Sequence, residues 1–465
     1  MIAGGLQSYS GKRVLMLQGP LGPFFARVAS DLDQVGAEVH KVNFNAGDWL
    51  FSLRCPWRGV SNFTGCISEW PGYFSELLTR LSIDVIFLFG DCRPIHVPAL
   101  AIARKRGIEV GVFEEGYLRP DYITLERGGV NNRSSLPDDP SFYLSKGLSP
   151  VTETHPVGST FRSAALWGIL YYTAATFGKP IFRNYWHHRR LGMLEGLYWI
   201  RSFVRKVRYC HGERRLEGPL LGDASERFFL VPLQTCGDAQ IKVHSRFRSI
   251  PRFIEHVIRS FARHAPSDCT LVIKHHPLDR GYSDHTKLVD RLIRKYQLES
   301  RCHYIHDQHL PSLLRNAQGV VVVNSTVGMS AVGEGVPVKV CGEAIYDMTG
   351  LTFQDELDSF WEGANVFRPD MKLWGAFRSV LIAHTQFNGS FYRRLSSTGY
   401  RSGVAWGASR DEAEIPTTIP LPEWTMTPLD AAEVLAASAD VPLTATDRSR
   451  REEPNVPIEE LAAAG

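Results

Sequence analysis

Residues 84–121 read DVIFLFGDCRPIHVPALAIARKRGIEVGVFEEGYLRPD. The segment begins with a short apolar run over 84–89, which predicts a buried strand that ends at Gly90. Residues 97–106 have the apolar spacing of a helix, and 108–113 form a second strand pattern. A strand, a helix and a second strand in this order predict a parallel sheet covered by helices.

The same alternation extends along the chain on both sides of this segment. Strand patterns cover 14–18 and 39–44, with helix patterns over 24–35 and 74–81. The alternation restarts later, with strands over 228–233, 270–274, 304–306, 320–324 and 336–340 and helices over 251–264, 285–296 and 310–316. We therefore predict an α/β fold of GT-B-like architecture, in which two Rossmann-like domains face a cleft. The predicted parts are a Rossmann-like domain over 1–150, a helical basic and aromatic segment over 151–224, a second Rossmann-like domain over 225–400, and an acidic, disordered tail over 401–465.

The formal net charge of +3 conceals two strongly charged segments. Residues 161–215 hold eleven Lys and Arg against two acids, a net of +9, whereas 411–465 hold twelve acids against three bases, a net of −9. The near-neutral total argues against an overall basic nucleic-acid binder. Aromatic residues such as Trp167 and Trp199 lie among the bases of 161–215, which predicts a surface for an anionic membrane. The alternative is a helical insertion whose aromatic side chains pack on the core.

Cysteine usage and hydropathy bear on the compartment. None of the eight cysteines forms a C-x-x-C pair, which favours reduced cytosolic thiols. Residues 1–10 lack the features of a signal peptide, and the apolar runs are too short to span a bilayer. We expect a cytoplasmic protein that meets a membrane from its surface.

Polar side chains follow the predicted strands at their ends. Glu114 and Glu115 follow strand 108–113, where a carboxylate can act as a general acid or base. His276 follows strand 270–274 and is held extended by Pro277, so that it can bind a phosphate together with Lys274. The alternatives are solvated loop acids and a structural histidine pair. A metal is not expected here, because no carboxylate or cysteine lies at ligand spacing in the sequence.

Two further loops complete the set. Ser325 and Thr326 follow strand 320–324 and resemble a helix N-cap, which attracts phosphate, although a plain cap explains them equally well. Gln234 and Asp238 lie in the loop after strand 228–233. The chain lacks a G-x-G-x-x-G fingerprint, a P-loop and a plausible D-x-D metal site, which disfavours the corresponding nucleotide-binding classes. Together the strand-end residues are those that a nucleotide-sugar site needs.

The motifs E-E-G (114–116), H-P (276–277) and S-T (325–326) resemble those of bacterial GT-B sialyltransferases, which use CMP-activated acid sugars. The chain resembles more closely the capsule polysaccharide biosynthesis family of β-Kdo transferases, of KpsS/LipB type. Residues 18–25, 41–45, 89–94 and 113–121 carry this resemblance in the first half, and 234–241, 274–277 and 324–328 carry it in the second. The resemblance covers about residues 12–390.

That resemblance implies transfer of Kdo from CMP-β-Kdo to a phosphatidylglycerol-type lipid, which starts the linker on which capsule is exported. It places the acceptor on the side of 1–150 and the CMP-sugar on the side of 225–400. A β donor and a β product mean retention of configuration, which is compatible with a double displacement through an enzyme carboxylate. The implied partners are CMP-Kdo as donor substrate, with no metal or other cofactor, the lipid acceptor and the anionic inner face of the cytoplasmic membrane. Other capsule assembly enzymes are further candidate partners, and nucleic acid is not.

The resemblance and the chemistry together suggest roles. Asp238 is the predicted nucleophile and Glu115 the general acid/base, with Glu114 as the alternative. His276 would stabilise the departing CMP phosphate, helped by Ser325 and Thr326 at a helix N-terminus. The candidate substrate-binding residues are Lys274, Gln234, Asn324, Arg93 and Arg119. Inverting chemistry would instead use Glu115 as the base and leave Asp238 idle.

Two other functions stay open at this point. One is another CMP-sugar GT-B transferase, such as a sialyltransferase-like enzyme with a soluble glycan acceptor. The other is a non-catalytic capsule assembly or export partner, which the acids at the strand ends disfavour because a scaffold does not need them.

Overall fold

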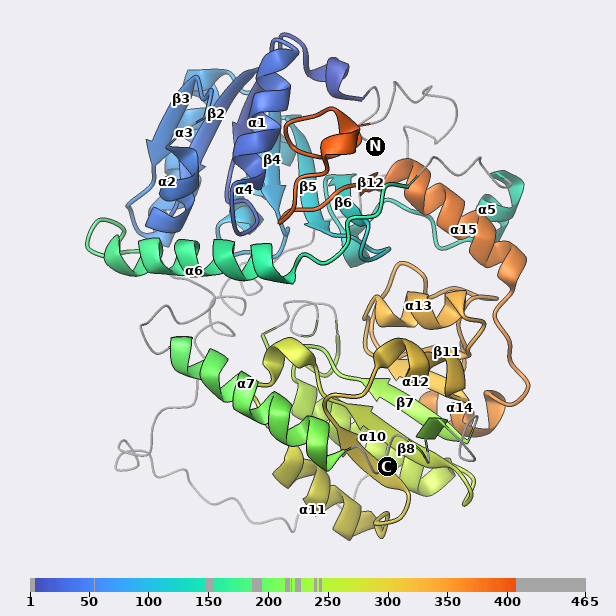
Figure 1. Ribbon diagram of the computed structural model, residues 1–465. Helices are drawn as coiled ribbons and strands as arrows, with labels where there is room; N and C mark the ends of the chain where they lie inside the picture. Colours follow the sequence, from blue (N-terminus) through green and yellow to red (C-terminus); the bar gives the residue numbers. More distant parts are fainter. Residues whose placement is uncertain are drawn as a thin grey trace, which may run out of the picture. The chain divides into compact units, whose positions relative to one another are not determined.

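The computed structural model describes residues 5–53, 55–146, 154–185, 195–213, 218, 220–221, 227–237, 241 and 245–406. Within these residues the chain forms two sheets, each with helices on its faces (Figure 1). The predicted α/β class, with two Rossmann-like halves and a helical segment between them, is confirmed.

The first sheet has seven strands in the order β12-β6-β5-β4-β1-β2-β3. The five strands from β3 to β5 are parallel, whereas β6 runs antiparallel to β5, and β12 runs antiparallel to β6. Their bounds are β1 (Arg13–Met16), β2 (Glu38–Asn43), β3 (Gly59–Asn62), β4 (Val85–Phe89), β5 (Glu109–Glu115), β6 (Tyr122–Arg127) and β12 (Gln386–Asn388).

Helices cover both faces of this sheet because alternate strand residues are apolar on both sides. In β1, Val14 and Met16 pack into one core with α1, whereas Leu15 packs into the other core, which contains residues of α3 and α4. The helices of the first half are α1 (Phe24–Gln34), α2 (Ala46–Ser52), α3 (Trp70–Leu81) and α4 (His96–Lys105). Helix α5 (Pro140–Lys146) instead contributes Tyr143 to a core of the second sheet.

The second sheet has five parallel strands in the order β11-β10-β7-β8-β9. Residues of α12, α13 and α15 belong to one of its two cores, and residues of α10, α11 and α14 belong to the other. The strands are β7 (Phe228–Pro232), β8 (Thr270–Lys274), β9 (Cys302–Ile305), β10 (Gly319–Val322) and β11 (Val338–Val340). The helices are α10 (Ile250–His264), α11 (Thr286–Tyr296), α12 (Leu310–Asn316), α13 (Val327–Gly333), α14 (Leu357–Gly363) and α15 (Met371–His384).

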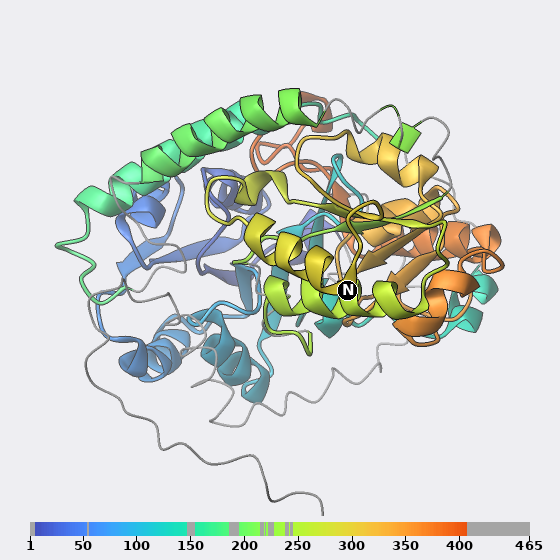
Figure 2. The ribbon, with the colours of Figure 1, turned by 90° about the horizontal axis from the view of Figure 1, so that it is seen from below.

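Two longer helices lie between the halves in the sequence. The first, α6 (Phe161–Phe177), packs on α2 of the first half. The second, α7 (Glu195–Gly212), packs on the second half, where Tyr198 stacks on Tyr282 with ring centres 5.0 Å apart. Gly281 permits this approach, because a Cβ atom there would lie 2.3 Å from the Tyr198 carbonyl oxygen. Figure 2 shows α7 along the outer edge of the view.

The basic and aromatic segment has both buried and exposed aromatic side chains, and its membrane role stays a prediction. Tyr171 and Phe182 are buried, so part of its aromatic content packs on the core. Phe177 and Trp199 are exposed, so another part faces outward. Residues 186–194 of this segment lie outside the described residues.

The acid pair lies inside a strand rather than after it, which corrects the predicted strand end at Phe113. Strand β5 continues through Glu114 and Glu115, which pair with Thr124 and Ile123 of β6. The antiparallel pairing with β6 extends strand β5, and β6 was not predicted from the sequence.

The predicted boundaries of 225–400 and 401–465 also need correction. Strand β12 belongs to the first sheet, although its residues fall within 225–400. Residues 401–406 are packed rather than disordered, because the buried Asp31 carboxylate of α1 accepts hydrogen bonds from the backbone of Arg401 (2.7 Å) and Ser402 (3.0 Å) and from the Trp406 indole (3.1 Å). The rest of the predicted tail, 407–465, lies outside the described residues.

Candidate active site

Two glutamates form the carboxyl end of β5. Glu114 Oε1 accepts a hydrogen bond from the Glu115 backbone N–H (3.0 Å), and Glu115 Oε1 accepts one from the Tyr392 hydroxyl (3.0 Å). Burial raises the pKa of Glu114 to about 7, and the nearby carboxylates of Glu115 and Asp91 act in the same direction. Glu114 can therefore exchange a proton near neutral pH.

Arg93 lies beside this acid, in the loop after β4. Its Nη1 donates to the side-chain oxygen of Gln18 (2.8 Å), and its guanidinium lies 5.0 Å from the centre of the Phe89 ring. Gly90 has a φ of 74°, and a Cβ atom there would lie 3.6 Å from Glu114 Oε2 and 3.8 Å from Arg93 Nε. The ends of β1, β4 and β5 thus bring together three of the polar side chains that follow these strands.

A buried polar network links this site to the α6 segment. The Gln18 amide donates to Asp48 Oδ2 (3.1 Å) and to the Tyr185 hydroxyl (2.8 Å), and the Tyr171 hydroxyl donates to Asp48 Oδ1 (3.3 Å). Neither Asp48 nor the two tyrosines was predicted as a site residue. Asp48 lies in the first turn of α2, so only its place in the helix that follows β2 could have indicated it, whereas the tyrosines lie more than 120 residues away from it along the chain.

In the second half, the loops after β7 and β10 meet through two predicted site residues. The Gln234 amide donates to Asn324 Oδ1 (3.0 Å), and the Asn324 backbone N–H donates to Gln234 Oε1 (3.4 Å). Ser325 Oγ accepts a hydrogen bond from the Val327 backbone N–H (3.2 Å), and Thr326 is the N-cap residue of α13. The S-T motif therefore begins a helix, as the sequence predicts, although the Thr326 side chain forms no capping hydrogen bond.

Lys274 and His276, at the end of β8, occupy different environments. Lys274 is buried, and its ammonium donates to the His306 carbonyl oxygen (3.1 Å). Burial lowers the pKa of Lys274 to about 8. His276 is only partly buried, and its Nδ1 accepts a hydrogen bond from the Leu278 backbone N–H (3.2 Å).

Two predicted site residues remain, of which only Arg119 belongs to the described residues. Arg119 is exposed, and its Nε donates to the Gly116 carbonyl oxygen (3.1 Å). Asp238, the predicted nucleophile, lies outside the described residues, which end at Gly237 in this loop. The roles of both stay predictions.

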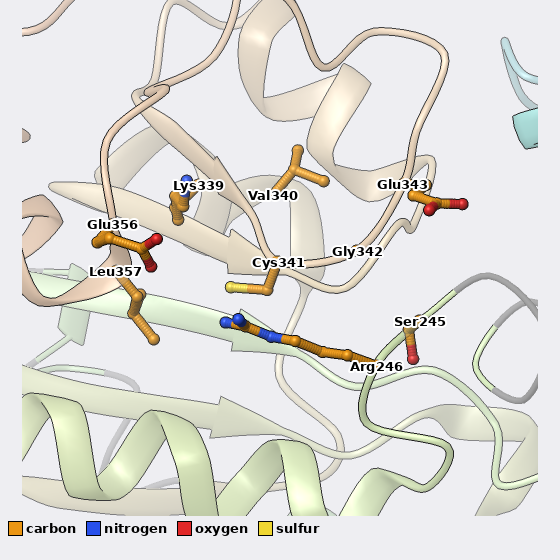
Figure 3. A pocket seen from close by; sticks show the side chains of 9 residues that line it. All are labelled: Ser245, Arg246, Lys339, Val340, Cys341, Gly342, Glu343, Glu356 and Leu357. Carbon is orange, nitrogen blue, oxygen red and sulfur yellow. The ribbon is translucent and has the colours of Figure 1, made fainter. Parts of the chain in front are cut away.

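A pocket of about 350 Å³ lies beyond the carboxyl end of β11 (Figure 3). Its charged lining residues are Arg246, Lys339, Glu343 and Glu356. In Figure 3 the Arg246 guanidinium extends toward Cys341. Of the predicted site residues that the structure describes, none lines this pocket, although β10, which precedes Asn324, is the strand next to β11.

These sites accompany a sequence that belongs to the capsule polysaccharide biosynthesis protein family. The sequence profile of that family matches residues 84–392. The predicted family resemblance is thereby confirmed.

Two curated relatives match most of the chain. The capsule polysaccharide export protein KpsS of Escherichia coli is 40% identical over 82% of this chain and 97% of its own length. The capsule polysaccharide modification protein LipB of Neisseria meningitidis serogroup B is 38% identical over 83% of this chain and 93% of its own length. Among solved structures, the β-Kdo 2,7 transferase of KpsC from Thermosulfurimonas dismutans aligns over 82% of this chain and 93% of its own, with 15% identity and a TM-score of 0.39.

In the part of the chain that the structure describes, no helix combines the length and the apolar character needed to cross a bilayer.

Proposed function

We propose that this protein is a retaining glycosyltransferase that moves β-Kdo from CMP-β-Kdo to a phosphatidylglycerol-type lipid. In the first step a carboxylate attacks the anomeric carbon, the bond to the CMP phosphate breaks, and CMP leaves. In the second step the acceptor hydroxyl attacks the same carbon, the sugar–carboxylate bond breaks, and a general base takes the hydroxyl proton. Two displacements return the β configuration.

The observation that carries this proposal is the Glu114–Glu115 pair at the end of β5, within a member of the capsule polysaccharide biosynthesis family. A base that works near neutral pH needs a pKa close to 7, and burial raises the pKa of Glu114 to about that value. Glu115 instead accepts a hydrogen bond from Tyr392. We therefore prefer Glu114 over Glu115 as the base, with Glu115 and Tyr392 as positioning residues.

The nucleophile is tested by substitution and trapping. Asp238→Ala should abolish transfer from CMP-Kdo to phosphatidylglycerol, and Asp238→Asn should do the same with little change in size. Wild-type protein incubated with donor and no acceptor should gain the mass of one Kdo, at a peptide that contains Asp238. Near-normal turnover by Asp238→Ala would rule out this nucleophile, and NMR of the product linkage would reveal inversion.

For the donor nucleotide we propose the pocket beyond β11. Ligands of such sheets bind beyond the carboxyl ends of the strands, and Arg246 and Lys339 provide positive charge there. The reciprocal Gln234–Asn324 pair and the S-T motif lie at the ends of neighbouring strands β7 and β10.

For the lipid acceptor we propose that α7 meets an anionic membrane. Its exposed apolar side chains are Leu197, Tyr198, Trp199, Ile200, Phe203, Val204 and Val207. Exposed Arg201, Lys206 and Arg208 lie among them, and each basic residue near an acidic leaflet contributes about 1 kcal/mol. Another side of α7 packs on the second half, where Arg205 forms a salt bridge with Asp284 (2.7 Å).

Vesicle co-sedimentation tests this surface. Phe203→Glu removes an apolar side chain of α7 that is 70% exposed. The matched control is Val366→Glu, which replaces an apolar side chain of the second half that is 86% exposed. If the Phe203 ring is buried in the membrane on binding, its loss costs about 2 kcal/mol of binding free energy. Phe203→Glu should therefore weaken binding to phosphatidylglycerol vesicles roughly thirtyfold, while the control stays near wild type. Binding that ignores salt and anionic lipid content would contradict the proposal.

A donor screen separates this function from the alternatives. Turnover with CMP-sialic acid or a UDP-sugar, and not with CMP-Kdo, would indicate a different transferase. No turnover with any donor, in the presence of both lipid and soluble acceptors, would favour a non-catalytic role in capsule assembly or export.

A further inference from the structure

We propose that Cys236, Asp279 and His285 bind a zinc ion. The three residues come from two loops of the second half. Cys236 follows β7, Asp279 ends the turn after β8, and His285 is the N-cap residue of α11. Asp279 lies three residues after His276 in the sequence, and folding brings Cys236 from the loop after β7 to the same place.

The distances between the donor atoms suit one small cation. One ligand atom of each residue lies within 4.8 Å of the others, and the Cys236 sulfur is 3.5 Å from His285 Nε2. Zinc binds sulfur at about 2.3 Å and imidazole nitrogen at about 2.0 Å, so tetrahedral angles place these two ligands about 3.5 Å apart. The cysteine and histidine are thus already at the separation that a shared zinc ion would require.

The charges also favour a cation. Asp279 is 6% exposed and His285 is 7% exposed. Asp279 Oδ2 accepts hydrogen bonds from the Cys236 backbone N–H (3.2 Å) and from the Ser283 hydroxyl, and within the described residues no lysine or arginine forms an ion pair with it. A buried carboxylate without a cationic partner is costly.

A second buried donor lies beside the cluster. His275 is 2% exposed, and its Nδ1 is 2.6 Å from the Tyr304 hydroxyl. Its Nε2 is buried and has no hydrogen-bond partner in the part of the chain that is described. The centre of its ring is 6.0 Å from that of His285. This nitrogen can complete a fourth zinc position through a bridging water or a small rotation of the side chain.

The mixture of sulfur, nitrogen and oxygen donors selects zinc over magnesium or calcium, which prefer oxygen alone. Bound there, the ion would join the loop after β7 to the loop after β8. It would hold in place the backbone that leads to Asp238 on one side and to His276 on the other. The inference does not depend on the identity of the sugar donor.

Metal content of the purified full-length protein tests the proposal. We expect about one zinc per chain by mass spectrometry of the metal, after dialysis against zinc and removal of the excess. Cys236→Ala and His285→Ala should each lower the content to below a tenth of that value. Cys269→Ala is the matched control, because Cys269 is a buried thiol of the same half outside the cluster.

Cobalt gives a second readout that does not rely on stability. Cobalt-loaded wild type should show a thiolate-to-cobalt charge-transfer band, which Cys236→Ala abolishes and Cys269→Ala keeps. Circular dichroism of each variant separates loss of the site from loss of the fold. Wild-type protein that is folded but takes up neither zinc nor cobalt would overturn the proposal, as would equal uptake by wild type and Cys236→Ala.

Discussion

Replacing Glu114 by glutamine should change the stability of the protein in a pH-dependent way. Burial raises the pKa of Glu114 from 4.5 to about 7, so between these values the folded state binds a proton that the unfolded state has lost. Because folded protein binds more protons there, its free energy of unfolding falls as the pH rises from 4.5 to 7. The difference between the two pKa values corresponds to a fall in the free energy of unfolding of up to about 3 kcal/mol. A glutamine at this position does not ionise, so Glu114→Gln should not lose this stability as the pH rises.

The assay is urea unfolding of both proteins at several pH values. Below pH 4.5 the two free energies of unfolding should differ little through this group, whereas above pH 7 Glu114→Gln should be the more stable, by up to about 3 kcal/mol. Glu115→Gln is the control, since it removes the neighbouring carboxylate of the same strand. A difference between wild type and Glu114→Gln that stays constant from pH 4 to pH 8 would refute the raised pKa.

Activity should follow the opposite direction. A general base must be ionised, so under the proposed function the wild-type kcat rises with pH through about 7 and then levels off. Glu114→Gln should lower kcat by a factor of about 10² to 10⁴ and remove this rise. If Glu114→Gln keeps the wild-type rate and pH profile while Glu115→Gln loses activity, Glu115 is the base. With Glu114 as the base, the enzyme would be most active at the pH values where the ionised Glu114 makes the folded state least stable.

Three further predictions follow from contacts described above. Asp31→Ala removes the acceptor of two backbone N–H groups and one of the two acceptors of the Trp406 indole, and should lower the free energy of unfolding in urea by about 2–4 kcal/mol, whereas Asp33→Ala, at an exposed position, should stay near wild type. Gly281→Ala forces a Cβ against the backbone of α7, so protease cleavage within that helix should accelerate roughly tenfold, and Gly212→Ala, with open space around it, should not accelerate it. Arg246→Ala should raise KM for the donor nucleotide roughly tenfold with kcat nearly unchanged, and an unchanged KM would remove the pocket from the site.

The sequence predicted most of the regular fold because the buried parallel strands are unbroken apolar runs. Strand β8 (Thr270–Lys274) and helix α12 (Leu310–Asn316) have the predicted bounds. Strand β12 was missed because its partner β6 lies about 260 residues away, which leaves no local pattern. Strand β6, which pairs with its neighbour β5, was not predicted, and the end of β5 was therefore missed as well, since β6 decides where the ladder stops.

The candidate site was predictable to the extent that its residues follow strands directly. Gln234 and Asn324 each follow a strand and do contact each other. By contrast, Asp48, Tyr171 and Tyr185 meet Gln18 only after α6 packs on α2, so no spacing in the sequence brings them together. The same holds for Cys236 and His285, which lie 49 residues apart.

Strand β12 has a consequence for the order in which the chain is built. The first sheet receives its last strand at Gln386–Asn388, and Asp31 receives its partners only at residues 401–406. A ribosome therefore finishes the whole second half before the first half can close. In architectural terms the second half is an insertion within a discontinuous domain. A fragment that stops at residue 385 would expose an unpaired β6 edge, whereas excising the interior and splicing 386–406 to the first half would preserve the pairing of that edge.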